Sequence, residues 1–247
     1  MTRPGAWPYP RLLAHRCGGT LAPENTLAGL RAAARAGCRG VEFDVMLSGS
    51  GTPVLIHDES WNRTTDGAGR VAETPDEEIA RLDAGSWFGP AFAGEPVPTL
   101  ERAARLCREL GLATNVEIKP AAGQEAATGR AVALAAARLW QGDSVPPLLS
   151  SFSAVALSAA RQAGVALPRG LLVETIPDDW YERMTQLACF SLHCDAARND
   201  LTSIAAIARR GVPLLCYTVN DRERAAELLG AGASAVVSDR VDLMDFY

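Results

Sequence analysis

The sequence is poor in the features that mark nucleic-acid-binding and disulfide-stabilised proteins. Only one of its 24 basic residues is a lysine, it has three histidines, and its formal net charge is −5. The arginines do not gather into a basic stripe, which a nucleic-acid-binding surface would need. The six cysteines show no paired spacing, so we expect neither a disulfide framework nor a zinc site. We therefore expect no nucleic-acid partner.

Long apolar runs are also absent. No segment reaches the roughly 20 apolar residues of a membrane-spanning helix. The N-terminal residues Met1 to Pro8 hold no apolar run of the kind found in signal peptides. We expect a reduced, cytoplasmic compartment and no stable insertion into a membrane. No linker or low-complexity segment interrupts residues 1–247, which indicates a single domain, present as a monomer or a homodimer.

Two short segments, 40–45 and 115–120, resemble each other because charged and apolar residues alternate in both. On a β-strand, residues two apart share a face, so the charged residues of each segment point the same way. If both strands lie in one parallel sheet beneath helices, three carboxylates and one ammonium converge on the inside. The converging residues are Glu42 and Asp44 from the first segment and Glu117 and Lys119 from the second.

Converging carboxylates in a protein interior require a partner that offsets their charge. A hard divalent cation bound through carboxylate oxygens would supply it. The alternative is that the two segments are edge strands with solvated charges. Helical patterns flank both segments and favour the covered sheet. The single lysine, Lys119, stands beside these carboxylates in a chain that otherwise uses arginine, which indicates that its compact ammonium is required there.

Buried strands and helices alternate along most of the chain. The eight predicted strands span 12–15, 40–45, 115–120, 147–152, 170–174, 189–194, 213–219 and 235–238. The first predicted helix starts at residues 23–26, with Asn25 or Thr26 as its N-cap and Gly37 as its stop. Further helices are predicted over 99–110, 124–140, 153–163, 179–187, 201–210 and 221–230, with Asn220 at the start of the last. Eight strands with helices between them, in under 250 residues, favour an α/β fold of the (β/α)₈ TIM-barrel type.

Residues 58–98 interrupt this alternation. Segment 53–57 is predicted to return beside strand 40–45 in a hairpin. The residues after it are rich in glycine and proline and include the aromatic residues Trp61, Trp87 and Phe88. We interpret 58–98 as an inserted lid over the barrel mouth, since such insertions often carry function. Its aromatic residues are expected to form a small core of their own more readily than a platform for substrate.

Charged and titratable groups mark the ends of four predicted strands. They are His15 and Arg16, Glu42 and Asp44, His57 and Asp58, and Glu117 and Lys119. In a (β/α)₈ barrel the carboxyl ends of the strands carry the chemistry. A cation, an arginine and a lysine can hold a phosphate and stabilise charge on it, while two histidines act as general acid and general base. This combination favours cleavage of a phosphodiester.

Six motifs in order resemble the motif series of glycerophosphodiester phosphodiesterases, in the short cytoplasmic bacterial form. They are His15-Arg16, Pro23-Glu24-Asn25-Thr26, Glu42-x-Asp44, His57-Asp58, Glu117-Ile118-Lys119 and Tyr217-Thr218-Val219-Asn220. Each motif alone is weak, but together they extend over nearly the whole chain. Two positions depart from the usual pattern: Cys17 stands where glycine is common, and Tyr217 where tryptophan is frequent.

The resemblance implies a barrel that uses one divalent cation, Mg²⁺ or Ca²⁺, to hydrolyse a small glycerophosphodiester to sn-glycerol 3-phosphate and an alcohol. The roles it implies assign the metal to Glu42, Asp44 and Glu117, acid–base catalysis to His15 and His57, and phosphate binding to Arg16 and Lys119. Phe152 and His193 are predicted to border the substrate. The nucleophile is water, or the glycerol 2-hydroxyl with a cyclic phosphate following, and the sequence does not assign the acid and the base.

Two other functions are compatible with the same fold. A related lipid phosphodiesterase would act on intact lipid through a cyclic phosphate and would carry an exposed apolar rim, of which the sequence gives no clear sign. A barrel without catalytic activity would bind glycerol phosphates as a sensor and would lack a histidine or a carboxylate of the site. Every one of those residues is present in the sequence.

Overall fold

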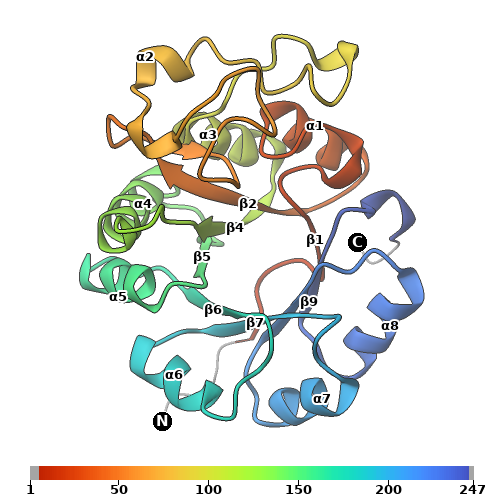
Figure 1. Ribbon diagram of the computed structural model, residues 1–247. Coiled ribbons are helices and arrows are strands. Elements are labelled where there is room, and N and C mark those ends of the chain that lie inside the picture. Colours follow the sequence, from red (N-terminus) through yellow and green to blue (C-terminus); the bar gives the residue numbers. More distant parts are fainter. Residues whose placement is uncertain (1–5, 245–247) are drawn as a thin grey trace.

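Parallel strands close into a barrel in the computed structural model, which describes residues 6–244 (Figure 1). In barrel order the strands are β1 (Leu12–Ala14), β2 (Gly40–Leu47), β4 (Ala113–Ile118), β5 (Leu148–Ser151), β6 (Arg169–Val173), β7 (Ser191–Asp195), β8 (Leu214–Tyr217) and β9 (Ala235–Ser238). Each pairs in parallel with the next, and β1 pairs with both β9 and β2, which closes the barrel. The predicted (β/α)₈ fold is confirmed. Strand β3 (Pro53–Leu55) pairs antiparallel to β2, as the hairpin prediction requires.

Helices surround the barrel and cover the outer faces of its strands (Figure 1). The α-helices are α1 (Leu27–Arg35), α2 (Asp76–Ile79), α3 (Leu100–Leu110), α4 (Glu125–Leu139), α5 (Ala154–Gln162), α6 (Trp180–Leu187), α7 (Leu201–Arg209) and α8 (Arg222–Gly230). The short 3₁₀ helices are η1 (Gly19–Leu21), η2 (Val71–Glu73), η3 (Pro90–Phe92) and η4 (Val241–Leu243). No helix within residues 6–244 combines the length and apolar character needed to cross a membrane. The expectation about a signal peptide concerns N-terminal residues of which 1–5 lie outside the described range.

The helix starts confirm Thr26, one of the two predicted caps of α1, and correct the predictions for Asn25 and Asn220. Thr26 caps α1, because its side chain accepts a hydrogen bond from the backbone N–H of Gly29. Asp221 caps α8 in the same way. Asn25 and Asn220 each precede the cap, and their amides bind aspartates elsewhere, so neither starts a helix. Gly37 follows the end of α1 with a φ of 93°, as predicted for its stop.

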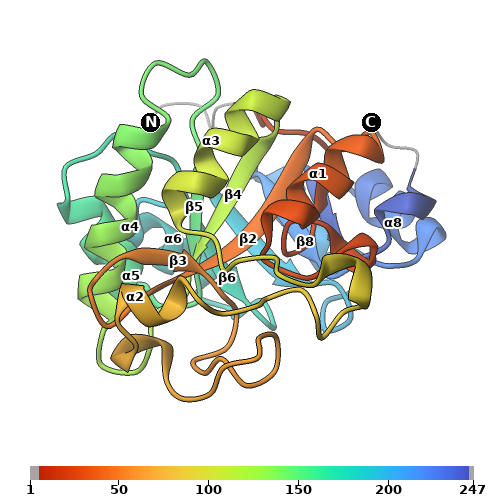
Figure 2. The same cartoon turned by 90° about the horizontal axis from the view of Figure 1, so that it is seen from above.

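The insert, residues 58–98, packs beside β2 and β3 on one side of the barrel (Figures 1 and 2). Its buried Trp61 donates a hydrogen bond to Thr74 and lies in one apolar cluster with Val71 and Ile79. Trp87 and Phe88 of the insert are exposed, at 42% and 38%. The small core is therefore centred on Trp61. The role of the insert as a lid stays a prediction.

Candidate active site

A cavity of about 200 Å³ opens at the carboxyl ends of the barrel strands. All nine residues singled out in the sequence line it: His15, Arg16, Glu42, Asp44, His57, Glu117, Lys119, Phe152 and His193. Loops after β1, β3, β4 and β5 and strands β2, β4 and β7 supply them, so residues 178 positions apart meet. The structure therefore brings all nine side chains to one cavity, while the role of each stays a prediction.

Three carboxylates meet where β2 and β4 run side by side. Asp44 stands opposite Glu117 in the strand register, and β2 has neighbours on both sides, which excludes the edge-strand alternative. One oxygen each from Glu42, Asp44 and Glu117 lies within 4.8 Å of the others. Burial, and then repulsion by Asp44, raises the pKa of Glu42 to about 7 and that of Glu117 to about 8. Such a set of buried oxygens could hold a metal ion.

Asp44 is held in place by two donors and one acceptor. The Asn25 amide donates to Asp44 Oδ2 at 2.9 Å, and its oxygen accepts from the Asp44 backbone N–H at 3.1 Å. Lys119 Nζ donates to Asp44 Oδ1 at 3.3 Å and lies 3.6 Å from Glu117 Oε1. Burial would raise the pKa of Asp44, but Lys119, His57 and Arg16 outweigh it and keep the pKa below its usual value. Asn25 is thus a site residue that the sequence reading took for a helix cap.

His15 is oriented by a carboxylate from the far end of the chain. Its Nδ1 lies 2.6 Å from Asp239 Oδ1, and Asn220 donates to Asp239 Oδ2 at 2.9 Å. With Nδ1 donating to Asp239, Nε2 is the atom left for the cavity, and it lies 4.0 Å from Glu42 Oε2. Burial lowers the pKa of His15, but Asp239 and Glu42 together raise it above its usual value. Sequence reasoning missed Asp239, although it directly follows the last strand, where a barrel places site residues.

His57 has a matching arrangement. Its Nδ1 lies 2.6 Å from Asp58 Oδ1, which again leaves Nε2 for the cavity. Here burial and the Lys119 ammonium outweigh Asp44 and Asp58, so the pKa of His57 is lowered. The two imidazoles therefore share a geometry and have pKa values shifted in opposite directions.

Two cations accompany these groups. The backbone N–H of Arg16 donates to Glu42 Oε2 at 3.0 Å, and its Nη1 donates to Glu24 Oε1 at 2.9 Å. The Arg16 backbone has a φ of 48°, in the left-handed region that most side chains avoid. Its guanidinium and the Lys119 ammonium both line the cavity. An arginine and a lysine that converge in this way can bind a phosphate through charge-assisted hydrogen bonds.

An apolar wall and a buried histidine complete the cavity. Phe152 is 48% exposed and packs edge-on against Tyr217, with ring centroids 6.1 Å apart. His193 is fully buried, with Nε2 2.9 Å from Ser191 Oγ, and burial lowers its pKa to about 3. Its contact with substrate stays a prediction. Cys17 is also fully buried, and burial raises the pKa of its thiol, so it does not offer a reactive thiolate.

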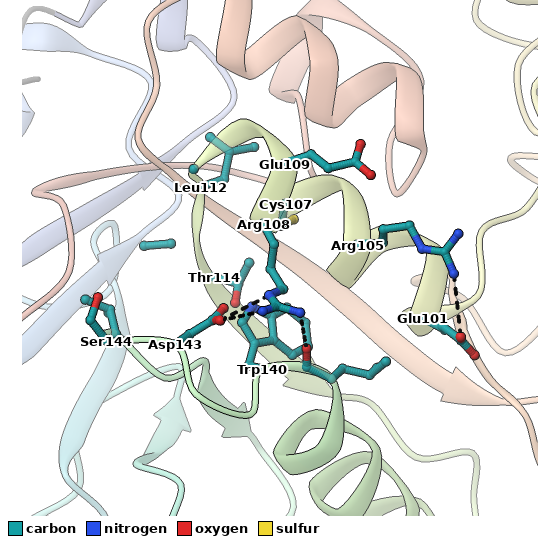
Figure 3. A pocket seen from close by; sticks show the side chains of 14 residues that line it. Glu101, Arg105, Cys107, Arg108, Glu109, Leu112, Thr114, Trp140, Asp143 and Ser144 are labelled. Carbon is teal, nitrogen blue, oxygen red and sulfur yellow. Dashed lines mark hydrogen bonds and ion pairs between the residues drawn. The ribbon is translucent and has the colours of Figure 1, made fainter.

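A larger hollow of about 790 Å³ lies elsewhere, between α3, the start of β4 and the end of α4 (Figure 3). Its arginines already face carboxylates: Arg108 lies 2.9 Å from Asp143, and Arg105 lies 3.8 Å from Glu101. The hollow borders the amino end of β4, whereas barrel enzymes react substrates at the carboxyl ends. The smaller cavity is therefore the candidate active site.

Comparison with known proteins shows the family to which the residues of this cavity belong. Residues 15–243 match the Glycerophosphoryl diester phosphodiesterase family. A glycerophosphodiester phosphodiesterase of Caldanaerobacter subterraneus subsp. tengcongensis is 32% identical over 229 residues, which cover 92% of this chain and 93% of that protein.

Solved structures of phosphodiesterases also resemble this chain. A phosphodiesterase of Oleispira antarctica, solved in complex with the product sn-glycerol-3-phosphate, is 38% identical with a TM-score of 0.89, covering 95% of this chain and 94% of that one. A glycerophosphodiester phosphodiesterase of Agrobacterium tumefaciens, 24% identical with a TM-score of 0.79, shares the fold over 95% of this chain and 98% of that one. The family match includes every residue of the cavity named above, and the chain belongs to the glycerophosphoryl diester phosphodiesterase family.

Proposed function

We propose that the protein hydrolyses glycerophosphodiesters, the small molecules left when phospholipids lose their acyl chains, to sn-glycerol 3-phosphate and an alcohol. The observation that carries the proposal is a cavity of about 200 Å³ lined by two imidazoles, three carboxylates and two cations. Each imidazole has a carboxylate on its Nδ1. Family membership and the product-bound phosphodiesterase of Oleispira antarctica support the same reaction.

Glu42, Asp44 and Glu117 would hold one divalent cation, Mg²⁺ or Ca²⁺. The raised pKa values of Glu42 and Glu117 reflect buried charge that their protein neighbours do not fully offset. Their donor atoms are oxygens, which hard cations prefer. When bound, such a cation would polarise a phosphate oxygen and stabilise negative charge that develops there.

Arg16 and Lys119 would bind the non-bridging phosphate oxygens. Both side chains are partly buried, which strengthens their attraction to an anion relative to a solvated cation. Lys119 also lies beside two of the carboxylates, so it would hold the phosphate close to the acidic cluster. Phe152 and Tyr217 would offer an apolar surface for the glycerol carbons. His193 would offer a polar group to the substrate.

His15 and His57 would divide the proton transfers. One accepts the proton of the attacking hydroxyl, and the other donates a proton to the leaving alkoxide as the P–O bond breaks. The attacking group is either water or the glycerol 2-hydroxyl; in the second case water then opens a cyclic phosphate. The net reaction consumes one water. Cytoplasmic location and a monomeric or homodimeric state remain predictions from the sequence.

The test is to incubate purified protein with glycerophosphocholine and Mg²⁺, to follow the phosphorus-containing products by ³¹P NMR and to measure choline by ¹H NMR. The proposal predicts sn-glycerol 3-phosphate, with free choline in equal amount. Release of phosphocholine would contradict it, as would binding of sn-glycerol 3-phosphate without any turnover. Cleavage of intact phospholipid to a lasting cyclic phosphate, with glycerophosphocholine untouched, would favour the lipid phosphodiesterase instead.

A further inference from the structure

Arg63 is the only residue of the insert, among those the structure describes, whose side chain is seen to bind two carboxylates that each hold a lining residue of the cavity. It does not line the cavity itself, and 43% of its side chain is exposed. The two carboxylates are Asp58, which holds His57, and Glu24, which holds Arg16. Isolated exposed ion pairs contribute little, but Arg63 makes bidentate pairs with two carboxylates in one network, and such a geometry fixes the groups that it joins.

The first branch runs from Arg63 to His57. Arg63 Nε donates to Asp58 Oδ2 at 2.6 Å and Nη2 donates to Oδ1 at 3.0 Å, so the guanidinium binds both carboxylate oxygens. Such a two-pronged contact fixes the plane of the carboxylate. Asp58 Oδ1 in turn accepts from His57 Nδ1 at 2.6 Å. The direction in which His57 presents Nε2 to the cavity therefore depends on how Asp58 is held.

The second branch runs from Arg63 to Arg16. Arg63 Nη1 and Nη2 each donate to one oxygen of Glu24 at 2.8 Å. Glu24 Oε1 also accepts from Arg16 Nη1 at 2.9 Å. Glu24 thus links the two guanidiniums, and Arg63 offsets part of a negative charge that would otherwise act on Arg16 alone.

We infer that Arg63 is a positioning residue that sets His57 and Arg16 together, so the insert completes the active site from outside the cavity. The inference rests on the proposed hydrolysis. It explains why one arginine, without contact to the cavity, donates to four carboxylate oxygens on two different loops. Loss of an outer partner that orients a metal-ligating histidine typically lowers activity by about 10- to 100-fold, and we expect a loss of similar size here.

The test compares Arg63→Lys and Arg63→Gln with Arg70→Gln. Arg70 is a matched control, because it lies in the same insert and pairs with Glu59 and Glu73, and none of the three lines the cavity. Both Arg63 variants should lose about tenfold or more in kcat. Arg63→Lys should not retain wild-type kcat, because an ammonium cannot form bidentate hydrogen bonds to two carboxylates. Arg70→Gln should keep wild-type kcat.

A second comparison tests whether Arg63 positions His57 and Arg16 or only holds the insert against the barrel. In a Glu24→Gln, Asp58→Asn background, Arg63→Gln should cost less than about twofold, since both carboxylates that transmit its effect are gone. An equal loss in both backgrounds, or wild-type kcat in both Arg63 variants, would overturn the inference. Arg63→Lys keeps a cation on the insert, so it supplies the same comparison if the glutamine variant does not fold.

Binding of sn-glycerol 3-phosphate, measured by calorimetry, gives a readout besides turnover. Arg63→Gln should weaken it, because Glu24 then offsets Arg16, while Arg70→Gln should not. Unchanged affinity in Arg63→Gln would contradict the Arg16 branch. If the wild-type protein itself did not turn over glycerophosphocholine, the proposed function would fail, and this binding comparison would still test Arg63.

Discussion

At the scale of single residues, the one lysine of the chain lies between two carboxylates of the candidate active site. The Lys119 ammonium lies 3.3 Å from Asp44 and 3.6 Å from Glu117 and faces the cavity. Lys119→Met should lower kcat by roughly 10²-fold or more, because it removes a charge that would stabilise the phosphate in the transition state. Steady-state kinetics would measure the loss, and circular dichroism should show an intact fold. Activity within a few-fold of wild type would make the unique lysine a coincidence.

The histidine pair gives a second prediction at this scale. His15→Ala and His57→Ala should each lower kcat by about 10²-fold or more. The double variant should lose much less than the product of the two, because the pair acts as a unit. The wild-type enzyme should show a bell-shaped dependence of kcat/KM on pH.

A substrate with a strongly acidic leaving group assigns the two roles. It should rescue the variant that lost the general acid and leave the variant that lost the general base inactive. Equal rescue of both variants, or of neither, would contradict the division of labour between His15 and His57.

Residue types and strand ends were enough to predict most of the cavity, but not the residues that hold its members in place. Pro23-Glu24-Asn25-Thr26 reads locally as a helix start, and α1 does begin there, capped by Thr26. Asn25 instead adopts a φ of 56° and turns its amide to Asp44, 19 positions away. Asp239 reaches His15 across 224 positions. Such contacts depend on how the barrel closes, which no local pattern encodes.

At the scale of elements, hydrophobic alternation located every barrel strand, with ends displaced by a few residues. Strand β4 begins at Ala113, before the predicted residue 115, and ends at Ile118, so Lys119 lies just past it. The displacement has a physical cause, because apolar alternation records which residues are buried, while a strand ends where its ladder of hydrogen bonds ends. The face on which each side chain points was unaffected, because the period of two was correct.

The contact between α4 and α5 depends on one glycine. A Cβ on Gly129 would meet the backbone oxygen of Ala156 at 2.2 Å, so the two helices approach more closely than any side chain allows. Gly129→Ala should therefore lower the free energy of unfolding by about 1–3 kcal/mol, although alanine is the better helix former. Chemical denaturation would measure it.

Gly230 in α8 is the matched control for that change. A Cβ there meets nothing within 4 Å, so Gly230→Ala should leave stability unchanged or raise it by up to about 1 kcal/mol. A stabilised Gly129→Ala variant would show that α4 and α5 can move apart at little cost.

At the scale of the whole molecule, the buried His193 makes stability depend on pH. Its folded-state pKa is about 3, below its usual value of about 6.5, because burial disfavours the charged ring. Below pH 6.5 the unfolded chain therefore binds a proton that the folded protein does not, and stability falls as the pH falls toward 3. His193→Gln should reduce the loss of unfolding free energy between pH 7 and pH 4 by up to about 3 kcal/mol. Denaturation curves at the two pH values measure it, and an unchanged loss in the variant would mean that His193 is protonated in the folded state.

Hydrolysis should require a divalent cation at the three carboxylates on β2 and β4. The most direct measurement is the rate of sn-glycerol 3-phosphate release from glycerophosphocholine before chelation, after it, and after Mg²⁺ or Ca²⁺ is restored. We expect chelation to abolish the activity and one of the two cations to restore it. Glu117→Gln should need far more cation, while Glu109→Gln, at the opposite end of the barrel, should behave as wild type. Full activity in metal-free protein would contradict the account.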